Sequence, residues 1–327
     1  MLWRLILQAL LALILLIPVF IVLGIITTVV ALSGAVDLTT MSNVQMVAFF
    51  QSQPVILAAT SLSVALVVFL SVWISARLFD RRPLEDFGLR FDAHWAPDLA
   101  FGLLLGALLM TGVFLAELAF GWVRVTGFLQ ASTGSFGGGI IAGLVSFVCV
   151  GIYEELLSRG YHMSNLAQGL RKLIGPRGGL LAGWVFSSAF FALGHLANPG
   201  ASAISTFNIL LAGLLLLGLG YLLTGSLAIP IGVHITWNFF QGNVFGFPVS
   251  GTLANQVTFI ATESVGPQAL TGGAFGPEAG LVGVAAMLLG ALLILVWVRW
   301  RRGALGLYLP MSEAPAGASA AHEGAQP

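Results

Sequence analysis

Residues 137–161, GGGIIAGLVSFVCVGIYEELLSRGY, form a long apolar run that ends in two adjacent carboxylates and an arginine. Upstream of Glu154 the run contains no charged residue. A helix needs about 20 apolar residues to cross the hydrocarbon core of a bilayer, and this run has nearly that length. It therefore predicts a membrane helix that carries Glu154, Glu155 and Arg159 at or near one end.

The composition of the rest of the chain agrees with this prediction. Of the 327 residues, 58% are hydrophobic and only 8% are charged, whereas soluble domains carry roughly 25% charged residues. This number of charged residues is too small to cover a surface that faces water. The main partner of the chain is therefore predicted to be the lipid bilayer. The formal net charge is zero, which gives no basic patch for nucleic acid. The single cysteine, Cys149, excludes an internal disulfide.

We predict an all-α, polytopic membrane helix bundle of about eight transmembrane helices. The predicted spans are about 5–31, 54–76, 98–120, 139–158, 179–197, 203–223, 227–245 and 280–298. The first is too long for the apolar part of a signal peptide and is expected to be retained. The seventh contains Pro230 and several polar groups, so it is expected to be a broken or partial helix.

The basic residues indicate the orientation of this bundle, because Lys and Arg concentrate in cytoplasmic loops. With the N-terminus in the cytoplasm, twelve of the 13 basic residues fall on that side and only Arg124 lies outside. Both termini are therefore predicted to be cytoplasmic.

Four regions follow from the predicted spans. Residues 1–79 hold two N-terminal transmembrane helices, 80–250 a membrane core, 251–310 an external Gly-rich loop with the last transmembrane helix, and 311–327 a disordered cytoplasmic tail. The whole external loop, 241–279, has no Lys or Arg and is long enough either to fold over a site or to stay mobile.

Ionisable side chains inside a bilayer cost free energy and therefore mark candidate functional sites. The candidates in or next to the predicted spans are Glu117, Glu154, Glu155, Arg159, His195 and His234, with Asn238 as a neutral companion. Glu117 lies near the outer end of its span and is expected to form a structural pair with Arg124, seven residues further on.

The two adjacent glutamates, Glu154 and Glu155, have different helical neighbours. On a helix Glu155 and Arg159 are spaced i and i+4, with the acid first, which favours an ion pair. Glu154 points about 100° away and has no such partner, and a desolvated carboxyl of this kind suits a general base. The alternative is that all three residues mark a helix end that reaches the cytoplasmic surface.

Two further motifs lie on later hydrophobic segments. Phe191 and His195 share one helix face, and His195 reaches the depth of Glu154 if residues 171–177 form the turn of a helical hairpin. His234 and Asn238 also share a face, where their donors could hold an oxyanion. Taken singly, each motif could equally be a packing or interhelical hydrogen-bonding device. Three such motifs on successive segments favour one polar site inside the bundle.

These residues resemble a known family. The segments EELLSR (Glu154, Glu155, Arg159), FALGH (Phe191, His195) and HITWN (His234, Asn238) resemble the EExxxR, FxxxH and HxxxN motifs of the CPBP family, the type II CAAX prenyl proteases and their bacterial relatives, also called ABI proteins. The resemblance covers roughly residues 80–250.

The resemblance implies an intramembrane glutamic endopeptidase without metal or other cofactor, located in a bacterial plasma membrane. It implies that Glu154 and His195 activate a water, that His234 and Asn238 stabilise the oxyanion, and that Glu155, Arg159 and Phe191 support the site. The substrate would be a peptide or a membrane protein.

Two alternatives stay open on the sequence. Glu154, His195 and His234 could bind a catalytic zinc, since two His and one Glu form a known ligand set. The same polar cluster could also belong to a transporter, or to a bacteriocin-immunity or scaffold protein without catalysis.

Overall fold

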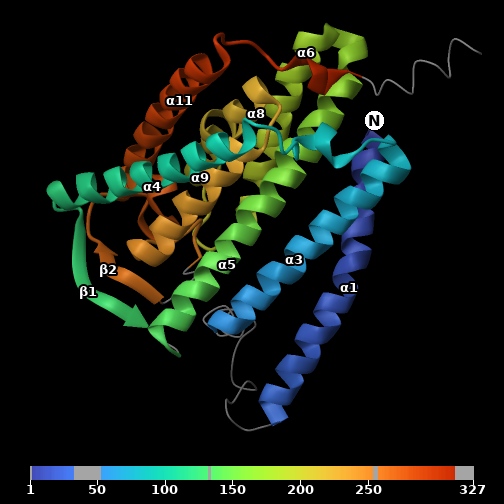
Figure 1. Ribbon diagram of the computed structural model, residues 1–327. Coiled ribbons are helices and arrows are strands. Elements are labelled where there is room, and N and C mark those ends of the chain that lie inside the picture. The colour runs from blue at the N-terminus through green and yellow to red at the C-terminus, as the bar shows by residue number, and fades with distance from the viewer. Residues whose placement is uncertain (1, 33–52, 132–133, 253–256, 314–327) are drawn as a thin grey trace, which may run out of the picture.

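A computed structural model describes residues 2–32, 53–131, 134–252 and 257–313 (Figure 1). Within these residues the chain is a bundle of helices, which confirms the predicted polytopic membrane architecture. Six helical stretches are long and apolar enough to cross a membrane: Trp3–Val29, Pro54–Asp80, Trp95–Ala119, Phe136–Ala197, Ala203–Thr224 and Leu281–Arg302. The fourth stretch holds two of the predicted spans.

The long helices of the bundle are α1 (Leu2–Leu32), α3 (Pro54–Ser75), α4 (Trp95–Ala119), α5 (Phe136–Glu155), α6 (Ser164–Gly194) and α11 (Leu281–Arg302). Shorter helices are α7 (Ala203–Leu211), α8 (Leu219–Thr224), α9 (Ala228–Phe239) and α10 (Gln268–Thr271). Four π-helical turns extend or interrupt them: η2 (Ala76–Asp80), η4 (Leu156–Met163), η6 (Ala212–Gly218) and η7 (Phe240–Val244). The 3₁₀ turns are η3 (Leu84–Phe87), η5 (His195–Ala197), η8 (Gly273–Phe275), η9 (Pro277–Ala279) and η10 (Leu309–Ser312).

Helix α1 lies at the edge of the bundle beside α3, and most of its apolar side chains are exposed (Figure 1). Two polar contacts fix it. The Gln8 amide donates to the Ser71 hydroxyl at 3.0 Å, and Arg4 pairs with the buried Asp80 at 3.0 Å. The other faces of α1 are free to contact lipid.

Helix α9, the predicted partial span, lies inside the bundle. It has only 12 residues, nine of them buried, and it is not among the six stretches that could cross a membrane. Pro230 fits in its first turn, where a helix does not need that N–H. The prediction of a shortened seventh segment is confirmed, and its neighbours α4 and α5 shield it from lipid.

Small residues bring these helices together. A side chain at Gly102 or Gly106 of α4 would meet the backbone carbonyls of Ile229 or Val233 on α9. Gly151 of α5 is similarly close to Ile235 of α9. Close backbone approach at small residues is how membrane helices gain packing energy.

Helix α6 is a hairpin of two helical arms. Ile174 and Gly175 have non-helical dihedral angles, Gly175 has φ of 74°, and Pro176 follows. The two arms then pack backbone to backbone, because Gly183 lies against Met163 and Ala167. A turn therefore lies within 171–177, which is the condition under which His195 reaches the depth of Glu154, and the second arm returns toward that level.

A small sheet corrects the all-helical prediction for the loops. β1 (Val123–Ala131) pairs with β2 (Val257–Ser264) in antiparallel register. Arg124 lies across from Glu263, with the closest charged atoms 3.8 Å apart. The predicted Arg124–Glu117 pair is therefore wrong. Glu117 is fully buried, and neither of its carboxyl oxygens has a hydrogen-bond partner within the residues described.

The chain stays ordered slightly beyond the predicted start of the tail. Met311 and Ser312 are buried in η10, and the backbone carbonyl of Glu313 accepts a hydrogen bond from Gln168 at 3.0 Å. Residues 311–313, which the sequence assigned to the disordered tail, are therefore folded, because the apolar Met311 packs against the core. Residues 314–327 lie outside those described.

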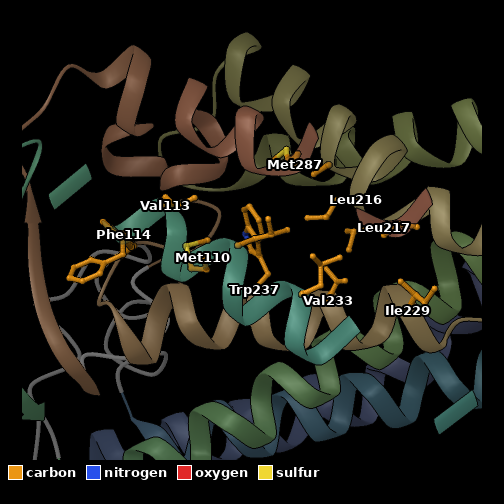
Figure 2. Packing of buried hydrophobic residues seen from close by; sticks show 14 of the residues in the cluster. Met110, Val113, Phe114, Leu216, Leu217, Ile229, Val233, Trp237 and Met287 are labelled. Atoms are coloured by element: carbon orange, nitrogen blue, oxygen red, sulfur yellow. The ribbon is translucent and has the colours of Figure 1, made fainter. Parts of the chain in front are cut away.

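The hydrophobic core joins α9 to α4, η6 and α11 (Figure 2). Met110 of α4, Leu216 of η6, Met287 of α11 and Trp237 of α9 converge there, each at most 6% exposed. At the rim, α4 is tied to α11 by Asp98, which accepts hydrogen bonds from Trp297 and Arg302, each at 2.8 Å. This core holds α9 in place.

We expect Gly102→Ala and Gly112→Ala to have opposite effects on thermal unfolding in detergent. An added methyl at Gly102 would meet the α9 backbone, whereas Gly112 on the same helix has open space around it. Overpacking costs about 1–3 kcal/mol, whereas replacing an exposed helical glycine gains up to about 1 kcal/mol. Equal shifts in melting temperature would contradict the α4–α9 packing described.

Candidate active site

The centre of the candidate site is a fully buried ion pair at the end of α5. Arg159 Nη1 donates to Glu155 Oε1 at 3.0 Å, and both side chains have no exposed area. The chain forms the π-helical turn η4 directly after Glu155, a local distortion that is frequent at functional sites. The predicted i, i+4 pair is present, and it lies inside the protein rather than at its surface.

His234 on α9 binds the same carboxylate. Its Nδ1 lies 2.7 Å from Glu155 Oε1. An ionised carboxylate can only accept hydrogen bonds, so Nδ1 carries the proton and donates. The position of the ring is thereby fixed, and Nε2 is left on the opposite side.

Arg159 extends the network to two more elements. Its Nη2 donates to the Gly213 carbonyl of η6 at 3.3 Å, and its guanidinium lies 4.3 Å from the ring centroid of Phe191 on α6. A Cβ atom at Gly213 would lie 3.2 Å from Nη2, a tight contact, so glycine favours this approach. Phe191 thus supports the buried arginine by a cation–π contact.

Glu154 takes a different direction from its neighbour, as the helical spacing predicts. Its side chain is 24% exposed, and its Oε2 lies 3.7 Å from His234 Nε2. The Tyr153 hydroxyl lies 3.5 Å from its Oε1. Glu154 is therefore outside the Arg159 pair but within reach of His234.

His195 ends the second arm of α6 and begins the 3₁₀ turn η5. Its Nδ1 lies 2.8 Å from the Phe191 carbonyl oxygen, which can only accept. Nδ1 is therefore the donor, and in the neutral ring Nε2 keeps its lone pair. The ring also packs on Phe191, with centroids 4.7 Å apart.

One cavity of about 290 Å³ brings the four candidate residues together: Glu154, His195, His234 and Asn238 all line it. A water molecule takes up about 30 Å³ in the liquid, so the space suits part of a peptide better than a single water. Much of the wall is apolar, contributed by Leu57, Phe147, Val150, Ile209, Leu216, Leu217, Trp237 and Met287. The core in Figure 2 thus also forms a wall of the cavity.

A second cavity, of about 310 Å³, lies between η4 and α6. Glu154 and His195 line this cavity as well, together with Ser158 and His162. Glu154 and His195 therefore lie between the two cavities and line both of them.

Sequence reasoning missed several residues that line the main cavity: Tyr153, Asn198, Ser250, Thr252 and Glu278. Glu278 is buried, although it belongs to the loop predicted to be external and Gly-rich. The sequence offers no signal that separates it from the exposed Glu263 of the same loop. Glu278 becomes buried, and Glu263 stays exposed, only when that loop folds against the bundle.

Residues 135–240 match the family described as Rce1-like, type II CAAX prenyl endopeptidase Rce1-like. The matched segment runs from the start of α5 to the end of α9 and contains all three motifs. The matched segment is similar to the CPBP family of type II CAAX endopeptidases. These endopeptidases are peptide hydrolases, so the match supports peptide hydrolysis as the class of reaction. The match is narrower than the expected 80–250. Comparison with curated proteins and with solved structures gave no match.

The zinc alternative receives no support from the arrangement of side chains. Across residues 2–32, 53–131, 134–252 and 257–313, no three His, Cys, Asp or Glu groups gather as metal ligands. The Nδ1 atoms of His234 and His195 have protein partners, so only their Nε2 atoms are left to face the cavity.

We expect Glu155→Ala and Glu154→Ala to differ sharply in stability, although the residues are adjacent. Loss of Glu155 leaves Arg159 buried without its carboxylate, and breaking a buried pair costs about 3–5 kcal/mol. Glu154 is partly exposed and outside that pair, so its loss should cost much less. Thermal unfolding in nanodiscs measures both, and equal destabilisation would contradict the central role of Glu155.

Proposed function

We propose that the protein is an endopeptidase that hydrolyses a peptide bond within the membrane, with a water activated by Glu154 and His195 and without a metal. The main support for this proposal is that one cavity is lined by Glu154, His195, His234 and Asn238. The family match supports the reaction class, and the contacts around each side chain support the individual roles.

The two histidines are suited to different roles because their Nδ1 atoms have different acceptors. His195 donates to a neutral carbonyl, which leaves a basic Nε2 that can take a proton from water. His234 donates from Nδ1 to the Glu155 carboxylate, which leaves its Nε2 facing the cavity. The proposed oxyanion role requires that Nε2 also carry a proton, so that Nε2–H can donate.

Charge balance supports the same assignment. Glu154 and Glu155 bring two negative charges into a region where Arg159 brings one positive charge. A protonated His234 would make the group neutral, and uncompensated buried charge is costly. The 3.7 Å separation between His234 Nε2 and Glu154 Oε2 fits an attraction of this kind.

The reaction then follows in two steps. Glu154 and His195 together take one proton from the water as its oxygen attacks the scissile carbonyl, and the oxyanion that forms accepts hydrogen bonds from His234 Nε2–H and Asn238 Nδ2–H. When the tetrahedral intermediate collapses, the C–N bond breaks and the acquired proton passes to the leaving amine. The other product is a carboxylic acid, which loses its remaining proton to the released amine or to water and so becomes a carboxylate.

The cavity also suggests the substrate class. Its largely apolar wall would accept large apolar groups next to the scissile bond. We infer that the substrate is a peptide or membrane-protein segment of that kind, cleaved in a bacterial plasma membrane. The family description makes a prenylated C-terminal segment one form to test.

We expect Glu154→Gln and His195→Ala to lower the cleavage rate about 10²–10⁴-fold, the usual contribution of a general base. His234→Ala and Asn238→Ala should lower it about 10²–10³-fold, as removal of an oxyanion donor does. The measurement uses the full chain in nanodiscs and a library of quenched fluorescent peptides, each with and without a farnesyl group on a C-terminal cysteine. Glu117→Gln, another buried carboxyl variant, is the control and should cleave at the wild-type rate. Undiminished cleavage by both Glu154→Gln and His195→Ala would exclude the mechanism.

The metal-free mechanism makes a separate prediction. Elemental analysis of the active, purified protein should find no stoichiometric zinc, and a strong chelator should leave the cleavage rate unchanged. Stoichiometric zinc that is lost together with activity would instead establish the metal alternative.

A further inference from the structure

We propose that Glu278 is a positioning residue that sets the spacing between His195 and the His234–Asn238 pair. It would do so through a hydrogen-bonded bridge formed by Asn198, Ser250, Glu278 and Gln241. This inference rests on the proposed function and adds a residue outside the family match, which ends at residue 240.

The bridge begins beside His195. Asn198, three residues after His195, donates from Nδ2 to the Ser250 carbonyl at 2.9 Å. Asn198 and Ser250 both line the main cavity. The segment 246–252, the Ser250 loop, is thereby attached to the end of the α6 hairpin.

Glu278 binds the other side of the same residue. Its Oε1 accepts a hydrogen bond from the Ser250 backbone N–H and a second from the Ser250 hydroxyl, the latter at 3.1 Å. Glu278 is only 3% exposed, and Gly276 next to it leaves no space for a side chain. The carboxyl is therefore built into the wall rather than free to move.

The bridge ends on the helix of the second histidine. Glu278 Oε2 accepts a hydrogen bond from Gln241 Nε2, and Gln241 comes three residues after Asn238. The Gln241 side chain also donates to the Pro248 carbonyl of the Ser250 loop, and its backbone carbonyl accepts from Phe247 N–H at 2.8 Å. Glu278 thus joins the two chain segments that carry the candidate catalytic groups.

The energetics of the carboxyl depend on this bridge. Burial raises the pKa of Glu278 to about 7, while the hydrogen bonds from Ser250 and Gln241 oppose the rise. A buried carboxyl that needs its donors in this way has a strong preference for one geometry. Displacement of any member therefore leaves the others with unsatisfied polar groups.

The first test is kinetic and uses whichever quenched fluorescent peptide the wild-type protein cleaves. Glu278→Ala should lower kcat about 10-fold or more and change KM less than about 3-fold, because misplaced catalytic groups slow the chemical step. Asn198→Ala should act in the same direction. The double variant should be no worse than the poorer single variant, since both interrupt one bridge. Glu117→Ala removes a buried carboxyl elsewhere and should leave kcat unchanged.

The second test does not depend on activity. In protein labelled with ¹⁵N-histidine, Glu278→Ala should shift the ring resonances of His195 and His234 and leave that of His94, on the loop before α4, in place. Glu278→Gln, which keeps the size and an acceptor oxygen, should shift them less. Unchanged His195 and His234 resonances, an additive double variant, or an equal kcat loss in Glu117→Ala would each overturn the proposal. If the wild type cleaves no peptide, the proposed function fails, and the resonances alone decide whether the bridge exists.

Discussion

The buried carboxylate of Glu155 is the interaction on which the rest of the site depends. It accepts from Arg159 on one side and from His234 on the other, and it has no exposed area. Arg159 in turn contacts the Gly213 carbonyl and the Phe191 ring. The Glu155–Arg159 pair thus fixes the relative positions of α5, α6, η6 and α9. A charge in such surroundings is stable only while all its partners are in place.

This constraint explains why two adjacent glutamates differ in character. Glu155 points into the bundle and is neutralised there, whereas Glu154 points to the cavity and is partly exposed. The two histidines also differ in their surroundings, because His234 donates to a carboxylate and His195 to a carbonyl. The proposed role of each side chain therefore depends on its hydrogen-bond partners and not only on its residue type.

The sequence was sufficient for the features that have a short-range cause. The i, i+4 spacing predicted the Glu155–Arg159 pair, and the basic residues of 171–177 indicated a possible hairpin that would bring His195 back. It was insufficient where distant segments meet. The residues next to Arg124 in the sequence do not indicate that it lies across from Glu263 instead of near Glu117. The residues next to Glu278 do not indicate that it is buried. Those outcomes depend on how the segment 245–280 folds back over α9.

In the proposed mechanism, water attacks a peptide carbonyl held between Glu154 with His195 and His234 with Asn238. An experimental structure with a phosphinate analogue of a cleaved peptide, whose tetrahedral phosphorus carries two oxygens, tests this arrangement. We expect one oxygen to accept hydrogen bonds from His234 Nε2 and Asn238 Nδ2, and the other to lie between Glu154 and His195. A phosphinate bound away from these four residues, or held by a metal ion, would contradict it.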